Sequence, residues 1–248
     1  MNLPLKPLHV DSLKEACVKR LEELILSGEL KVGVRLPSER DFAASLGVSR
    51  PVLHEALVDL SAIGLVSILA RRGVMVNDYR QSGSMAMLST LLTYHNGKFD
   101  PQLTSSLFAM RILVEKETAR LSALSITIEQ MDLLEQFIRL EASLDRNDLA
   151  ALVKQDFDFH LQIAVASGNL AYPLILNSFI AVYTHFTSLF FDGCRFTPVL
   201  DEVYAFHRCL VEAIRLHEPE KAVQIMSELL THGEQHLFAI LGKNSKED

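Results

Sequence analysis

Acidic and imidazole side chains recur at helical spacing in the second half of the chain. Asp156 and His160 stand four residues apart in the segment KQDFDFHLQIAVASGN, which places a carboxylate and an imidazole on one helix face. His207 lies on a later helical segment, and His232 and His236 lie four residues apart on the last one. Nitrogen and oxygen ligands gathered from several helices suit Zn, Ni or another divalent transition metal. The alternative is that these are separate polar residues, because the chain has 9 histidines in all.

Near the N-terminus, the run RLPSERDFAASLGVSRPVLHEAL combines basic and helix-capping residues. Ser38 is placed to cap a helix over Glu39–Leu46, and Gly47 suits the left-handed exit from it. Ser49 is placed to cap a second helix, with Pro51 in its first turn. Two short helices joined in this way predict a helix-turn-helix, whose second helix enters the major groove of DNA.

A β-hairpin is predicted directly after these helices. Leu65–Ile68 and Val74–Val76 are short β-like runs around a basic tip. Arginines can bind phosphate or the minor groove, and Arg50 can pair bidentately with guanine. The alternative for any one arginine is a solvated surface charge. The candidate DNA contacts lie at helix starts or on the hairpin: Arg35, Ser38, Arg40, Ser49, Arg50, Pro51, His54, Arg71, Arg72 and Gly73.

Charge is unevenly distributed along the chain. The net charge is −7, yet residues 1–80 carry 11 Lys and Arg against 10 Asp and Glu. Overall acidity therefore leaves DNA binding open, provided that the contact is local and N-terminal. Three cysteines without a CxxC pair, and no apolar leader segment, predict a cytoplasmic protein. The most apolar run, residues 174–191, contains too many polar residues for a lipid-facing span, so no membrane partner is expected.

The element pattern predicts a mainly α protein of two domains. Residues 1–76 would form a winged helix-turn-helix of three helices and a β-hairpin wing, and residues 77–84 a linker. Residues 85–248 would form an all-α seven-helix bundle that binds an effector and dimerises. The seven predicted helices cover residues 85–95, 102–124, 127–145, 148–167, 171–191, 197–216 and 219–241.

The N-terminal motifs resemble the GntR family of bacterial transcription regulators. The runs LPSER, LGVSR and EAL all match, and the Arg-Arg-Gly wing is similar. One departure is His54, at a position that is commonly Arg in that family. The helical half is similar to the sensor (FCD) domain of the FadR branch, through Arg111 with Glu115, Asp156 with His160, the run Ser167-Gly168-Asn169, and His207 followed by Ala222 and Met226.

The resemblance implies a metal held by one Asp and three His. Asp156, His160 and His207 match three of these ligands, whereas Leu229 occupies the position of the fourth. We therefore expect His232, one helical turn further on, or His236, two turns further on, to complete the site, or a water to do so. Such a site would accept a small carboxylate effector.

Three further residues are candidates for binding that effector: Arg111, Tyr183 and His236. The alternatives are that Arg111 pairs internally with Glu115, four residues on, and that Tyr183 is a core residue. A second resemblance points to a different ligand. Ser82–Leu91 and Ala166–Phe186 look like the fatty-acid-responsive FadR regulator, which implies an acyl-CoA effector and no metal.

The expected function is a homodimeric, sequence-specific repressor of transcription that binds double-stranded operator DNA under control of a small molecule. The alternatives are an acyl-CoA-responsive regulator of fatty acid metabolism and a metal-dependent hydrolase. The sequence argues against an enzyme, because it offers no general base beside Asp156, His160 and His207, no phosphate loop and no nucleophile elbow.

Overall fold

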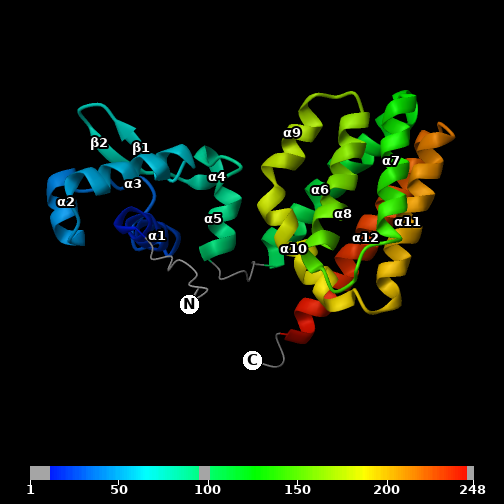
Figure 1. Cartoon of the computed structure of the whole chain (residues 1–248). Helices are drawn as coiled ribbons and strands as arrows, with labels where there is room; N and C mark the ends of the chain where they lie inside the picture. Colours follow the sequence, from blue (N-terminus) through cyan, green and yellow to red (C-terminus); the bar gives the residue numbers. More distant parts are fainter. Residues whose placement is uncertain (1–11, 95–100, 245–248) are drawn as a thin grey trace, which may run out of the picture. The chain divides into compact units, whose positions relative to one another are not determined.

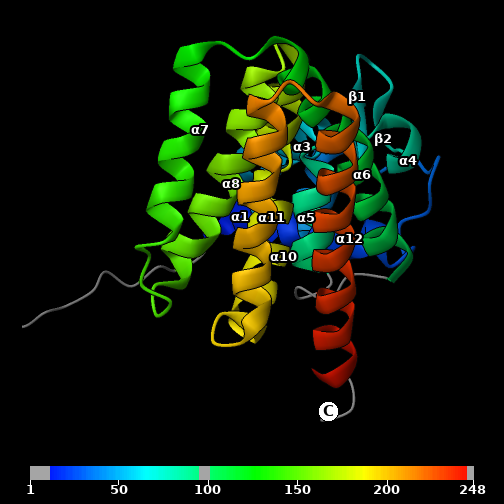
Figure 2. The same ribbon diagram turned by 90° about the vertical axis from the view of Figure 1, so that its right-hand side faces the viewer.

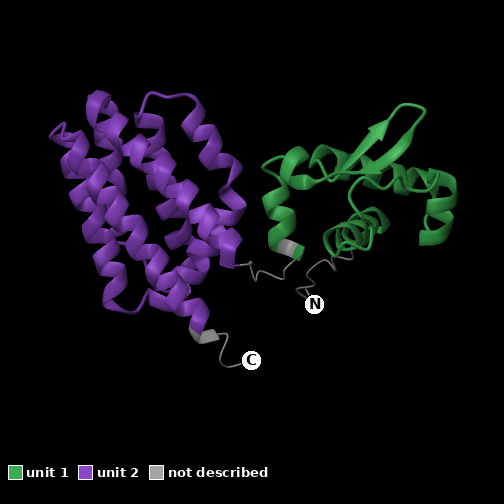
Figure 3. Cartoon of the chain, turned by 180° about the vertical axis from the view of Figure 1, so that it is seen from behind, with its two compact units in different colours: residues 1–98 green, residues 99–248 purple. Residues whose placement is uncertain are grey.

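The computed structural model describes residues 12–94 and 101–244, and the chain separates into two units, residues 1–98 and 99–248 (Figure 3). In the first unit three helices precede the β-hairpin (Figure 1). The helices are α1 (Leu13–Leu26), α2 (Glu39–Leu46) and α3 (Arg50–Ala62). Leu21 of α1 and Leu53 of α3 are completely buried, so the apolar stripes of α1 and α3 face each other.

The predicted caps of α2 and α3 are present. The Ser38 side chain accepts the Asp41 N–H, and the Ser49 side chain accepts the Val52 N–H. Gly47 ends α2 with a φ of 69°, which is the left-handed conformation that glycine adopts at little cost. The two helices are therefore joined by a tight turn, as the sequence predicts.

Strands β1 (Val66–Leu69) and β2 (Gly73–Val76) form an antiparallel hairpin. A third stretch of backbone lies along β2, because the Leu36 N–H donates to the Val74 carbonyl and the Val76 N–H donates to the Val34 carbonyl. This pairing fixes Arg35, opposite Met75, beside the wing. The hairpin completes a winged helix-turn-helix.

The segment after the wing differs from the expected linker at residues 77–84. It contains a short helix, α4 (Tyr79–Ser82), and it is fastened to the first unit by backbone hydrogen bonds from Asn77 to Leu65 and from Ser84 to Ile63. Helix α5 (Met87–Tyr94), expected in the C-terminal bundle, packs on α1 instead. Buried apolar side chains of α5, such as Met87 and Leu91, draw it onto that unit.

The second unit consists of seven helices within residues 101–244. A buried central helix, α8 (Leu149–Ala166), contacts α6, α7, α9 and α10, and the longest helix, α12, packs against α6, α10 and α11. Phe159 and Leu210 are completely buried among these helices. The other bounds are α6 (Pro101–Ser125), α7 (Ile128–Glu141), α9 (Ala171–Ser178), α10 (Ile180–Cys194), α11 (Pro198–Arg215) and α12 (Pro219–Asn244). The predicted class, a winged helix-turn-helix with a helical bundle, is confirmed.

One predicted helix, residues 171–191, is two helices in the structure. Helices α9 and α10 are bent by 63° where they meet. The Phe179 N–H turns back to the Leu176 carbonyl at 3.0 Å, which tightens and ends α9 before α10 begins. Among the described residues no single helix is long and apolar enough to cross a membrane, and this bent pair passes that test only when taken together.

We predict that Gly64→Ala destabilises the first unit more than Gly47→Ala does. Gly64 has a φ of 86°, and an added Cβ would overlap the carbonyl oxygen of Ser82, whereas a Cβ on Gly47 would meet no atom within 4 Å. Gly47→Ala should cost about 1–2 kcal/mol for its left-handed backbone alone, and Gly64→Ala should cost more. Thermal unfolding of both variants, followed by circular dichroism, measures this. Equal losses would contradict the role assigned to the contact between Gly64 and Ser82.

Candidate nucleic-acid interface and buried polar site

The N-terminal tip of α3 is open to solvent. Ser49, Arg50, Pro51 and His54 are all exposed, while Leu53 on the opposite face is completely buried. One face of the helix thus holds the core and the other presents polar side chains. This is the arrangement that a recognition helix needs in order to enter a groove.

A carboxylate that the sequence analysis did not single out links two of these side chains. Glu39, in the first turn of α2, receives a 3.5 Å hydrogen bond from Arg50 Nε and lies 3.1 Å from His54 Nδ1. Glu39 therefore restrains both side chains at the tip. Its position in the LPSER run, among residues expected to face DNA, was the available signal.

The flanking arginines differ in their surroundings. Arg35, Arg71 and Arg72 are exposed and make no ion pair within residues 12–94 and 101–244. Arg71 adopts a φ of 62°, which turns the hairpin at its basic tip, next to an exposed Gly73. These three cations lie beside the wing and are available to an anionic partner.

Ser38 and Arg40, in contrast, share a partner inside the protein. Ser38 Oγ donates to Asp41 Oδ2 at 2.7 Å, and Arg40 Nε donates to Asp41 Oδ1 at 3.1 Å. The Ser38 hydrogen bond, followed by the Arg40 contacts, lowers the pKa of the Asp41 carboxyl. Both residues are exposed, so the structure keeps them at the surface while pairing them locally.

In the second unit, three of the predicted metal ligands meet. Asp156 and His160 come from α8 and His207 from α11, and one ligand atom from each lies within 4.8 Å of the other two. All three side chains are buried, His207 to 1% exposure. Burial of three ionisable groups together requires that each has compensating partners.

Two buried carboxylates supply those partners. Glu141 Oε1, at the end of α7, lies 2.6 Å from His207 Nδ1, and the carboxylate of Glu115 on α6 pairs with His160 Nδ1. His207 Nε2 is buried, has no hydrogen-bond partner among the described residues, and lies 3.8 Å from Asp156 Oδ1. A histidine held by a carboxylate at one nitrogen, with the other nitrogen free toward a common point, is the arrangement found in metal sites.

Arg111 and Tyr183 extend this network. Arg111 Nε donates to Glu115 Oε1 at 2.5 Å, and Arg111 Nη2 donates to the Tyr183 hydroxyl at 2.8 Å. That hydroxyl donates to Asp156 Oδ2 at 2.6 Å. Both residues are thus joined to the buried site, and the internal pairing of Arg111 with Glu115, left open by the sequence, is present as well.

The charges in this network set its protonation. Burial acts to raise the pKa of the Glu115 carboxyl, but Arg111 and His160 outweigh it and lower that pKa to about 2. Burial acts to lower the pKa of His207, but Glu141 outweighs it and raises that pKa. Glu115 is therefore ionised near neutral pH, as a partner for the guanidinium of Arg111.

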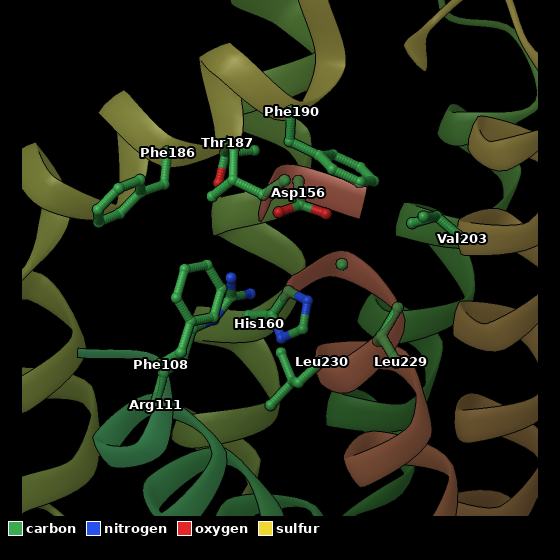
Figure 4. Close-up of a pocket in the computed structure, with 12 residues that line it drawn as sticks. Phe108, Arg111, Asp156, His160, Phe186, Thr187, Phe190, Val203, Leu229 and Leu230 are labelled. Atoms are coloured by element: carbon green, nitrogen blue, oxygen red, sulfur yellow. The ribbon is translucent and has the colours of Figure 1, made fainter. Parts of the chain in front are cut away.

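A cavity of about 50 Å³ opens against the same residues. Figure 4 shows Asp156, His160 and Arg111 on its polar side, with aromatic and leucine side chains around them. Leu229, at the position expected for a fourth ligand, is one of these apolar lining residues. A second cavity, of about 40 Å³, shares Arg111 and is lined by apolar side chains and Tyr183.

The structure does not bring His232 and His236 to this site, which corrects the expectation that His232 completes the ligand set. Leu229, Leu230 and Leu237 of α12 face the cavity, because their burial fixes the rotation of that helix. The two histidines consequently occupy a neighbouring face, where they group with Glu202 of α11.

Sequence reasoning missed Glu141 and the role of Glu115 toward His160. Glu141 is 66 residues from His207, so no local spacing connects them. The available signal was an acidic residue at the end of a helix that had to face the core. Glu115 was noted only for its spacing from Arg111.

Comparisons with known proteins agree with both units. The model for bacterial regulatory proteins of the gntR family matches residues 13–76, and the FCD domain model matches residues 106–232. The chain is 29% identical over 240 residues to the HTH-type transcriptional regulator Mce2R of Mycobacterium tuberculosis, covering 96% of this chain and 97% of that protein. It is 31% identical over 235 residues to the HTH-type transcriptional repressor NanR of Escherichia coli K12, covering 89% and 82%.

A solved structure has a similar fold. Lar, which controls expression of the agr system of Listeria monocytogenes, aligns with a TM-score of 0.50 at 18% identity over 94% of this chain and 99% of that one. The resemblance to a DNA-binding head followed by an FCD effector-binding domain, inferred from the motifs, is confirmed. This chain belongs to the GntR family of bacterial transcriptional regulators, with a C-terminal FCD domain.

Proposed function

We propose that this regulator acts in the cytoplasm as a homodimeric repressor that binds a two-half-site operator and responds to a small carboxylate held by a metal ion in the FCD domain. The observation that carries the DNA-binding part is the exposed tip of α3, with the exposed arginines Arg35, Arg71 and Arg72 at the wing. The observation that carries the effector part is the convergence of Asp156, His160 and His207 beside a cavity.

On DNA, Arg50 would read a guanine in the major groove, since its guanidinium stands at the start of the recognition helix. Arg35, Arg71 and Arg72 would neutralise phosphates or enter the minor groove. Glu39 would hold Arg50 in one orientation and so favour base reading over indiscriminate contact. A dimer is proposed because one short helix reads only a few base pairs.

The buried residues fit a divalent transition metal such as Zn or Ni. His207 Nε2 has no hydrogen-bond partner in residues 12–94 and 101–244, and the other nitrogen of that ring is held by Glu141, so the ring is oriented for coordination. Asp156 and His160 complete a set of three ligands of the type these metals accept. When bound, the metal would offer a Lewis-acid centre to one oxygen of the effector carboxylate.

Other residues that line the cavity would bind the remainder of the effector. Arg111 is fixed by Glu115 and Tyr183 at the polar wall of the cavity and would attract an anion. The leucine and phenylalanine walls would exclude water from it. The small volume of the cavity favours a compact carboxylate over a long acyl chain, so we prefer this effector to an acyl-CoA.

We propose binding rather than turnover, because Glu115 and Glu141, the acids next to the ligand set, are already engaged in holding histidines. In the dimer the two DNA-binding units would adopt two alternative spacings, of which one fits the operator. An effector would shift the population toward the spacing that it binds more tightly, and this difference in affinity supplies the free energy of the change.

The DNA-binding part is tested with the triple variant Arg50→Ala, Arg71→Ala, Arg72→Ala. Loss of one bidentate base contact costs about 1–3 kcal/mol, and two lost phosphate contacts lower the salt dependence of binding by a slope of about 2. Fluorescence anisotropy on a duplex selected by the wild type, at several salt concentrations, measures both effects. Lys154→Ala, which removes an exposed cation from the second unit, is the control and should bind normally. Unchanged affinity of the triple variant would refute the interface.

The metal part is tested by elemental analysis of dialysed protein, in which we expect about one tightly held equivalent per chain. Asp156→Asn and His160→Ala should lose it. Glu141→Gln removes only the group that orients His207 and should weaken metal affinity by about 10–100-fold. His54→Ala, a histidine in the first unit, should retain the metal. Wild-type protein without metal, under conditions in which it is folded, would refute this part of the proposal.

A further inference from the structure

A second group of potential ligands lies outside the buried site. Glu202 on α11 and His232 and His236 on α12 each offer one ligand atom, and these atoms all lie within 4.8 Å of one another. The two helices run side by side (Figure 2). We propose that these three residues form a second, solvent-accessible site for a divalent transition metal, which joins α11 to α12. The proposal goes beyond the function proposed above and does not depend on it.

The spacing of the two histidines suits chelation. His232 and His236 are four residues apart on one continuous helix, and their ring centroids are 4.5 Å apart. Two histidines at this spacing on one helical face bind zinc in other proteins, because both rings can reach one ion. The helix backbone therefore pre-positions two nitrogen ligands without any loop having to be ordered.

The third ligand comes from the neighbouring helix. His232 Nε2 lies 2.7 Å from Glu202 Oε2. Two ligand atoms around a tetrahedral ion at 2.0–2.1 Å stand roughly 3.3 Å apart, so only a small opening of this pair admits the ion. Glu202 can make that movement, because its side chain is 54% exposed.

The surroundings of His232 also point to a ligand. Its Nδ1 is buried and has no hydrogen-bond partner within the described part of the chain. Its ring packs against Phe206, at 5.5 Å between centroids, which limits its freedom. Buried polar atoms ordinarily have a partner, so this Nδ1 is a signal for an ion or an ordered water, while Nε2 of the same ring already faces Glu202.

The group is separate from the buried site. Leu229, Leu230 and Gly233 line the inner cavity from α12, and Val203, next to Glu202, lines it from α11. The second group therefore lies on an adjacent face of both helices. Its ligand set of two imidazoles and one carboxylate favours Zn, Ni or Cu over Mg or Ca, and three protein ligands leave a position for water.

The test is a zinc titration of full-length, dialysed protein, followed by calorimetry. We expect the wild type to take up one equivalent beyond the tightly held one, with a rise in the thermal unfolding midpoint because the ion ties α11 to α12. His236→Ala and Glu202→Gln should each weaken this uptake by about 10-fold or more, because each removes one of three ligands. Gln235→Ala, an exposed change on the same helical turn, is the matched control and should leave it unchanged.

The two sites are separated with Asp156→Asn. If the second group binds zinc by itself, this variant loses the tightly held equivalent and keeps the titratable one. The proposal is overturned if the wild type takes up no additional zinc, if uptake persists in both His236→Ala and Glu202→Gln, or if it disappears in Asp156→Asn. A wild type that lacks the tight equivalent but binds the titratable one contradicts only the function proposed for the buried site.

Discussion

The second unit depends on one constraint: ionisable groups in the middle of a helical bundle must be paired with one another. His207 with Glu141, and His160 with Glu115, place two acids and two imidazoles where each would otherwise be costly to bury. The helices α6, α7, α8 and α11 must hold these side chains at fixed distances for the pairing to succeed. The packing of these helices therefore determines the geometry of the polar site.

The same pairing decides which atoms remain available. Because Glu141 occupies one nitrogen of His207, the other nitrogen points to the space that Asp156 also faces. Phenylalanine and leucine side chains line the rest of the cavity beside these groups. In the first unit the corresponding carboxylate lies near the surface instead of in the core. Glu39 pairs with Arg50 and His54 there and orders both side chains while they remain accessible to solvent.

How far the sequence predicts this molecule depends on the range of each interaction. The caps at Ser38 and Ser49 and the exit at Gly47 are local, and the structure contains all three. The grouping of Asp156 with His160 follows from helical spacing, whereas the contact of Glu141 with His207 is set by tertiary packing over 66 residues. No pattern along one helix predicts such a contact.

Two expectations failed for a related reason. The rotation of α12 is fixed by its leucines, so the spacing of His232 from His207 along the chain could not show which face it occupies. Residues 77–84 have the polar composition of a linker, yet backbone hydrogen bonds, which composition does not report, hold them on the first unit. The polar composition of this segment is compatible with exposure to solvent, but its hydrogen-bond partners determine where it lies.

The contact between Gly64 and Ser82 restricts how the segment after the wing can move relative to α3. The absence of a side chain at Gly64 lets the backbone that follows the wing lie directly against the end of α3, without a compressible layer between them. A direct contact between two backbone segments restricts their relative movement more than a flexible linker does. Ser84 is hydrogen-bonded to Ile63, at the end of α3, and the opposite end of that helix carries Arg50, so the segment after the wing is joined directly to the helix with the exposed tip.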